Sequence, residues 1–228
     1  MAHPPLHPQN ERPPSVLTAG RTRDWPEYFR AMAGRPPRET LLEALDLHGP
    51  ADPGDPPLAI DLGCGEGRDT AELLARGWRV LALDGHPEAL LHLDRRPDAD
   101  IAQAKRDGRL ETRLALFEDL HELPEAALVN ASFTLPFCPP EHFARVWGLV
   151  RAAVRPGGFF AGQLFGDRDT WAAIPDRTHH TRGQALALLD GLTLHRFQEE
   201  EKDGEDCAGT KKHWHCFHVV AQRPHERA

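Results

Sequence analysis

A glycine-rich segment between two short apolar stretches constrains the fold of this chain most strongly. The stretch Leu58-Ala59-Ile60-Asp61-Leu62 runs directly into Gly63-Cys64-Gly65-Glu66-Gly67, where every second residue is glycine. Residues 68–74 are typical of a helix start, and a second apolar strand over residues 80–84 ends in an aspartate. Glycine lets a backbone turn tightly near a ligand, and a strand-terminal carboxylate can accept hydrogen bonds from both hydroxyls of a ribose. The combination predicts a nucleoside-binding site.

The spacing of the glycines limits which nucleoside ligands the loop can bind. Dinucleotide-binding loops follow G-x-G-x-x-G, whereas this loop reads Gly63-x-Gly65-x-Gly67. Asp61, just before the loop, would repel a diphosphate but can accept from the ammonium group of an amino acid or anchor the backbone of the loop. We therefore expect a nucleoside joined to an amino acid, and a nicotinamide-dependent oxidoreductase is the disfavoured alternative.

Residues 60–67 resemble the first motif of the class I S-adenosylmethionine-dependent methyltransferases. The Lys212-His213-Trp214 run is similar to the last strand of small bacterial methyltransferases of the tellurite-resistance and thiopurine types. The resemblance is specific across residues 60–84 and implies S-adenosylmethionine as cofactor, with S-adenosylhomocysteine as product. It also implies an α/β fold with a Rossmann-like, seven-stranded, mostly parallel sheet, helices on both faces and an antiparallel last strand. A non-catalytic protein that senses S-adenosylmethionine is a second alternative.

Strand and helix signals alternate along the rest of the chain, which is typical of a parallel sheet with crossover helices. Expected helices cover residues 38–47, 68–76, 139–154 and 181–189, and a further helix begins at Pro87. Expected strands cover residues 110–117, 126–131, 158–165, 192–198 and 213–221, with a turn over residues 199–206. Residues 1–21, rich in Pro and His, are expected to be a disordered tail, 22–57 a helical cap, and 58–228 the cofactor-binding domain of a single-domain protein.

Ligands of open α/β sheets lie at the carboxyl ends of the strands, so the residues that follow each strand are the cofactor-site candidates. These are Asp61, Gly63, Cys64, Gly65, Gly67, Asp84, Gly85, His86, Glu118, Asp119, Leu120 and Asn130. The family pattern implies an acidic acceptor for the adenine amino group, and Asp119 fits better than Glu118. A turn or capping role for Asn130 is an equal alternative.

The acceptor pocket is expected to form from the less regular segments, namely Trp25, Tyr28, Phe29, Phe133, Phe165 and Arg168. Trp25 and Phe29 alternatively pin an N-terminal helix to the sheet. Catalysis by positioning needs no assigned catalytic residue, and Tyr28, His86 and His215 are the candidates if a base is used. Asn130-Ala131-Ser132-Phe133 lacks the Asn/Asp-Pro-Pro-aromatic motif of base methyltransferases, so DNA bases are excluded as acceptors.

The histidine-rich C-terminal strand raises the question of a metal. His213 and His215 fall on one face of a strand and Cys216 and His218 on the other, so these four side chains cannot share one ion, and no metal is expected.

The expected partner is a small-molecule acceptor. The net charge of −8 disfavours nucleic acid, and the apolar runs are too short for a membrane span. Four cysteines without paired spacing suit a cytoplasmic protein, expected to be a monomer or homodimer.

Overall fold

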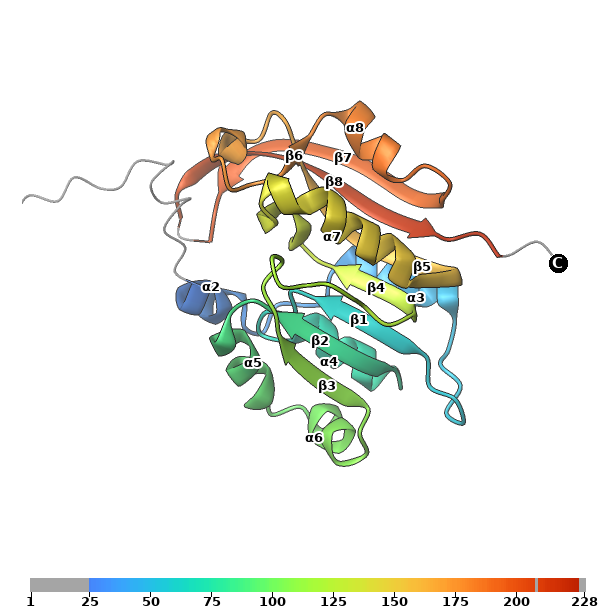
Figure 1. Ribbon diagram of the computed structural model, residues 1–228. Helices are drawn as coiled ribbons and strands as arrows, with labels where there is room; N and C mark the ends of the chain where they lie inside the picture. Colours follow the sequence, from blue (N-terminus) through green and yellow to red (C-terminus); the bar gives the residue numbers. More distant parts are fainter. Residues whose placement is uncertain (1–24, 208, 226–228) are drawn as a thin grey trace, which may run out of the picture.

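The computed structural model describes residues 25–207 and 209–225. Within them one sheet has the strand order β3-β2-β1-β4-β5-β8-β7, and a short strand, β6, pairs with β5 (Figure 1). The strands are β1 (Leu58–Leu62), β2 (Arg79–Asp84), β3 (Leu110–Leu114), β4 (Ala126–Ala131), β5 (Val154–Gly166), β6 (His179–His180), β7 (Thr193–Glu205) and β8 (Lys211–Gln222). The last strand, β8, runs antiparallel to both of its neighbours, and the others are parallel. The predicted fold class is confirmed.

Helices cover both faces of the sheet (Figure 1). They are α2 (Trp25–Met32), α3 (Glu39–His48), α4 (Arg68–Ala75), α5 (Pro87–Asp94), α6 (Ala99–Arg106), α7 (Pro140–Ala153) and α8 (Arg182–Leu188), with 3-10 turns η1 (Leu135–Phe137) and η2 (Thr170–Ala173). One buried cluster joins α3, α4 and α6 to residues of β1 and β2, and the other joins α7 and α8 to the opposite sheet face. Successive strand residues alternate between these clusters because side chains alternate across a strand.

Several predicted boundaries differ from those of the structure. Helix α7 ends at Ala153 rather than residue 154, and β5 begins at once, since the residue before Pro156 disfavours helical geometry. Strand β7 continues through Glu205, because the acidic run expected to turn pairs instead with the basic start of β8, as at Glu205 and Lys211. Strand β3 ends at Leu114 instead of residue 117, at the edge of the sheet.

The N-terminal part of the chain contributes two helices to the site. Residues 1–21, expected to be a tail, lie outside the described residues. Phe29 of α2 packs on His86 and His92, with ring centroids 5.8 Å apart in each pair, so α2 lies over the end of β2 and α5. Leu41 and Leu45 of α3 are buried against the sheet. Among the described helices, none combines the length and apolarity that a membrane span requires.

Candidate active site

The glycine loop is held by both its backbone and its neighbours. The amides of Gly63 and Cys64 both donate to the carbonyl of Leu83 on β2, at 2.8 and 2.9 Å. Gly63, Gly65 and Gly67 have φ of 72°, 54° and 85°, a region that other residues rarely adopt. A Cβ on Gly63 would lie 2.1 Å from Thr134 Oγ1, whereas one on Gly65 would meet nothing closer than Phe29 Cε1 at 3.7 Å. Packing thus requires glycine at 63, whereas at Gly65 a Cβ would make ordinary contact with Phe29 of α2 and only the positive φ favours glycine.

Asp84, at the end of β2, points back at this loop. Its carboxylate accepts from the amide of Gly65 at 2.9 Å and from that of His86 at 2.8 Å. Burial raises the pKa of Asp84, and these two amide donors oppose that rise. Two carboxylate oxygens carry about four acceptor sites, so the group can still accept from a ribose.

Asp61 belongs to a buried polar network instead of facing a ligand. Its carboxylate accepts from Thr70 Oγ1 at 2.6 Å and from Asn130 Nδ2 at 2.9 Å. Asn130 Nδ2 also donates to Asp69 at 3.1 Å, and Asn130 is fully buried. Asp61 was expected to accept from the cofactor or to anchor the loop, and Asn130 to bind the cofactor through its backbone carbonyl or its amide or to serve in a turn. The structure uses both side chains to tie β1, β4 and α4 together.

The loop expected to hold the adenine is fastened by α7. Arg145 donates to the carbonyls of Phe117 and Glu118, at 2.7 and 3.1 Å, and to that of Leu120. Glu118 and Asp119 are exposed and Leu120 is buried. The assignment of Asp119 to the adenine amino group stays a prediction.

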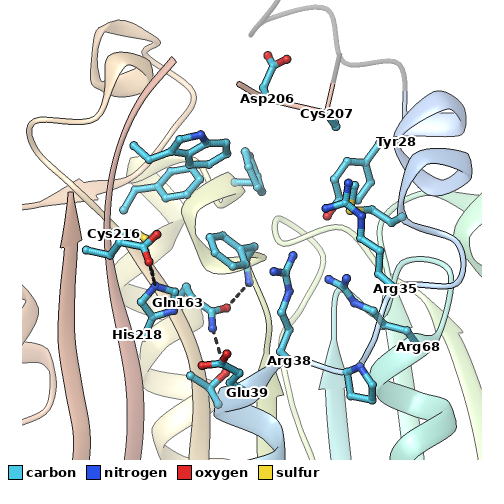
Figure 2. A pocket seen from close by; sticks show the side chains of 18 of the residues that line it. Tyr28, Arg35, Arg38, Glu39, Arg68, Gln163, Asp206, Cys207, Cys216 and His218 are labelled. Carbon is cyan, nitrogen blue, oxygen red and sulfur yellow. Dashed lines mark hydrogen bonds and ion pairs between the residues drawn. The ribbon is translucent and has the colours of Figure 1, made fainter. Parts of the chain in front are cut away.

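A cavity of about 800 Å³ opens beside the glycine loop. Figure 2 shows Arg35, Arg38 and Arg68 on one wall and Cys216 and His218 on the opposite wall. The cavity is bounded by α2, the start of α3, the segment after β4, the end of β5 and the β7–β8 hairpin. Its aromatic lining is Trp25, Tyr28, Phe133, Phe137, Phe165, Trp171 and Trp214.

Four of the six predicted pocket residues line this cavity: Trp25, Tyr28, Phe133 and Phe165. Phe29 does not, because its ring is buried between the glycine loop and α5. Arg168 does not either, since it pairs with Glu199 at 2.8 Å and Glu201 at 2.7 Å on the other face of the hairpin.

Of the three candidate bases, Tyr28 alone borders the cavity. The ring of His86 caps α5, where its Nδ1 accepts from the amide of Glu88 at 3.3 Å. The side chain of His215 is fully buried on the face of the hairpin that Arg168 contacts, and its Nε2 lies 3.0 Å from Glu199. Strand alternation therefore directs His215 away from the cavity.

Residues 59–158, from β1 into the first part of β5, match the protein-family model of the methyltransferase domain. Over this segment the chain is similar to the methyltransferase-domain family, and its fold is that of solved S-adenosylmethionine-dependent methyltransferases. A search of curated proteins finds no match.

Solved structures of methyltransferases share the fold of this chain. Haemophilus influenzae TehB superposes with a TM-score of 0.67 at 13% identity, over 87% of this chain and 67% of that one. A Burkholderia thailandensis 1,6-didemethyltoxoflavin-N1-methyltransferase, bound to its substrate and S-adenosylhomocysteine, gives 0.58 at 22% identity, over 89% and 82%. Bradyrhizobium japonicum N-methyltransferase NodS, in complex with S-adenosylhomocysteine, gives 0.58 at 15%, over 91% and 96%.

The site also holds two arginines whose position the sequence did not reveal. The guanidinium of Arg38 lies 4.5 Å from the ring centre of Phe133, and its buried Nε has no hydrogen-bond partner among the described residues. Arg68 Nε is 3.7 Å from Glu66 and 3.9 Å from Asp69, which are long ion pairs. Burial, and the nearby charge of Arg68, lower the pKa of Arg38. Two poorly paired guanidiniums beside the glycine loop fit an anionic group such as the carboxylate of the cofactor.

Gln163 is another site residue absent from the predictions. It is 1% exposed on β5, and it accepts from the amide of Phe133 and donates to Thr40 Oγ1, both at 2.9 Å. Phe133 has φ of 52°, which is costly for a residue with a side chain. A glutamine within the apolar run of β5 was the available signal, because a buried amide needs partners.

The aromatic wall rests on a buried ion pair. Lys212 pairs with Asp169, and both side chains are fully buried. The Lys212 ammonium lies 4.2 Å from the ring centre of Trp171 and 4.1 Å from that of Trp214. Asp169 also accepts from the amides of Trp171 at 2.9 Å and His215 at 3.1 Å. This arrangement fixes the two indoles at the cavity.

Proposed function

We propose that this methyltransferase transfers the methyl group of S-adenosylmethionine to a small molecule bound in the cavity of about 800 Å³. The observation that carries the proposal is the position of the cavity: Arg68 and Phe133, which adjoin the glycine loop and β4, also line it. Its volume and aromatic lining suit a small organic ligand, since such pockets measure about 300–1,000 Å³.

Three groups of residues hold three parts of the cofactor. The carboxylate of Asp84 holds the ribose, and Arg38 and Arg68 hold the carboxylate of the methionine portion. The loop at Asp119 and Leu120 holds the adenine. The bound cofactor supplies an activated methyl group on a positively charged sulfur.

The protein's contribution is then mainly positioning. Phe133, Phe165, Trp171 and Trp214 exclude water and hold the acceptor, and Gln163 fixes the backbone of Phe133 at the border between cofactor and acceptor. Tyr28 is the residue we assign to receive or orient an acceptor proton. The net charge of −8 supports an acceptor other than nucleic acid, and the absence of disulfides among the four cysteines supports the cytoplasm as location.

Calorimetry with S-adenosylhomocysteine, run beside NAD, tests the cofactor. Incubation with S-adenosylmethionine and panels of thiols, amines, carboxylic acids and phenols, read by S-adenosylhomocysteine formation, tests the acceptor. Saturable binding of S-adenosylhomocysteine with acceptor-dependent turnover supports the proposal. Binding without turnover across the panels would favour a sensor, and binding of NAD alone would overturn the proposal. Trp171→Ala should lose turnover while binding S-adenosylhomocysteine normally.

A further inference from the structure

Three side chains of different chemistry meet on the cavity face of the β7–β8 hairpin. Glu200 on β7 is the direct register partner of Cys216 on β8, and His218 lies two residues further along β8 on the same face. Cys216 Sγ is 3.5 Å from His218 Nε2, which is 4.0 Å from Glu200 Oε2. One ligand atom from each residue lies within 4.8 Å of the other two, and all three residues line the cavity.

The spacing suits a tetrahedral metal ion. A sulfur about 2.3 Å and a nitrogen about 2.1 Å from a tetrahedral ion lie about 3.6 Å apart. The 3.5 Å between Cys216 Sγ and His218 Nε2 is close to this value. Glu200 Oε2 lies 4.0 Å from His218 Nε2 and would have to come closer by roughly 0.6 Å, since an oxygen and a nitrogen on one tetrahedral zinc lie about 3.4 Å apart. A thiolate, an imidazole and a carboxylate together favour zinc over magnesium or calcium, which prefer oxygen ligands.

We propose that Glu200, Cys216 and His218 bind a zinc ion in the wall of the cavity, with one coordination position open to the cavity. Three protein ligands and an open position are typical of zinc sites that take part in chemistry. The expectation of no metal considered residues of β8 and the upstream Cys207, but no residue of β7. In the fold, Glu200 of β7 lies beside Cys216 and His218, which share one face of β8. The spacing of residues along β8 does not reveal this third ligand.

A second group on the hairpin serves as an internal comparison. Glu199, Glu201 and His215 also lie within ligand distance of one another, but on the opposite face. There the guanidinium of Arg168 already binds both glutamates, at 2.8 and 2.7 Å. Arg168 therefore neutralises the two glutamates, and the side chains of Glu199, Glu201 and His215 point away from the cavity.

The charges around the proposed site leave room for an ion. Lys202 is 2.8 Å from Glu200 Oε1, but its side chain is 60% exposed and can move into solvent. The other oxygen, Oε2, is the one that approaches His218. Arg196, the nearest arginine on β7, pairs with Glu39 and Glu43 at 3.3 and 3.2 Å.

The consequence for the acceptor rests on the proposed function. A thiol or hydroxyl acceptor bound at the open position would release its proton to solvent, because a zinc ion lowers the pKa of its ligands. The resulting anion would form a bond to the methyl carbon as the bond between that carbon and the cofactor sulfur breaks. S-adenosylhomocysteine leaves as a neutral thioether, so charge and atoms balance.

The direct test measures metal binding and requires no acceptor. Full-length protein, free of tags and stripped with a chelator, is titrated with zinc by calorimetry and with cobalt by absorption. We expect one zinc per chain and a thiolate-to-cobalt charge-transfer band. Mutating a residue that only hydrogen-bonds to a metal ligand typically lowers metal affinity about 10–100-fold. Cys216→Ser and His218→Gln remove the ligands themselves, so each should weaken zinc binding at least about tenfold. Cys216→Ser should also abolish the charge-transfer band. Glu200→Gln should weaken binding too.

Glu201→Gln and Cys138→Ala are the matched controls, one from the opposite face of the hairpin and one from a buried thiol outside the cavity. Both should keep the zinc affinity of the parent. Absence of saturable zinc binding, or binding by Cys216→Ser and His218→Gln that is as tight as that of the parent, would overturn the proposal. If Cys216→Ser does not fold, the partly exposed His218 and Glu200 variants decide. S-adenosylhomocysteine binding without zinc binding would overturn the metal site alone, and the converse would overturn the proposed function alone.

Discussion

The carboxylate of Asp84 accepts a hydrogen bond from the backbone amide of Gly65 at 2.9 Å, which joins the end of β2 to the glycine loop. Asp84→Asn replaces one acceptor by a donor that faces an amide, so we expect S-adenosylhomocysteine to bind more weakly by about 1–3 kcal/mol. Calorimetry measures this loss, and Asp100→Asn, on the exposed side of α6, should not change the affinity. An unchanged affinity for Asp84→Asn would remove Asp84 from the cofactor site.

Arg38 provides a test of the methionine end of the cofactor. Arg38→Gln should weaken S-adenosylhomocysteine binding by about 1.5–3 kcal/mol, the range for hydrogen bonds to charged groups. It should leave the affinity for 5′-methylthioadenosine unchanged, because that molecule lacks the carboxylate. Equal loss for both ligands would show that Arg38 acts on the shape of the site and not on the carboxylate.

Asp61 should make the stability of the protein depend on pH. Burial and the neighbouring Asp69 raise the pKa of Asp61 from 3.8 to about 7, against the opposing hydrogen bonds of Thr70 and Asn130. The folded state therefore holds this proton through a pH range in which the unfolded state has lost it. The stabilisation is present below pH 3.8 and is lost as the pH rises toward about 7.

Urea unfolding of the parent and of Asp61→Asn, from about pH 5 to about pH 8, measures this effect. The difference between the two free energies of unfolding should change by up to about 1.4 kcal/mol per pH unit below pH 7, with the parent losing stability relative to the variant as the pH rises. Above pH 7 the difference should level off. Parallel curves throughout would show that Asp61 is ionised in the folded protein.

Gly63 and Gly148 should respond in opposite ways to the same added methyl group. At Gly63, with φ of 72°, a Cβ would lie 2.1 Å from Thr134 Oγ1, so Gly63→Ala should destabilise the protein by about 1–3 kcal/mol or more. At Gly148, within α7, a Cβ meets no atom within 4 Å among the described residues, so Gly148→Ala should stabilise by about 0.5–1 kcal/mol. Thermal unfolding of the two variants tests both, and an unaffected Gly63→Ala would mean that the loop adapts freely.

Lys212 should be needed for folding because its charge neutralises Asp169 inside the protein. Lys212→Met leaves the fully buried carboxylate of Asp169 without its cation, so we expect a loss of about 3–5 kcal/mol. The double variant Asp169→Asn with Lys212→Met should recover part of that loss. Denaturant unfolding of both single variants and the double variant measures the coupling, and strictly additive losses would contradict a direct interaction.

Several elements were predictable because their signals are local. The strand over Ala126–Ala131 agrees with its prediction at both ends, and the strand and glycine loop over residues 58–67 needed only apolar residues followed by alternating glycines. The capping box of α8, with Thr181 and Gln184, likewise depends on residues that are close in the chain.

The wrong predictions share a different cause. Asp61 was expected to bind the cofactor or to anchor the loop, but Thr70 and Asn130, the second of them 69 residues away in sequence, take up its carboxylate. Phe29 and Arg168 were expected in the pocket. Phe29 packs instead against α5, and Arg168 pairs with Glu201, whose side chain lies on the face of β7 that points away from the cavity.

By itself the sequence determined the sheet, the glycine loop and the class of cofactor, because periodicity, glycine spacing and a strand-terminal aspartate act over a few neighbouring residues. The tertiary structure alone decided which side chains share the cavity. Arg38 and Arg68 come together from α3 and α4, and Glu200 reaches Cys216 and His218 through the register of β7 on β8. Such encounters depend on strand register and helix packing, which are set by the burial of the whole core and not by local spacing.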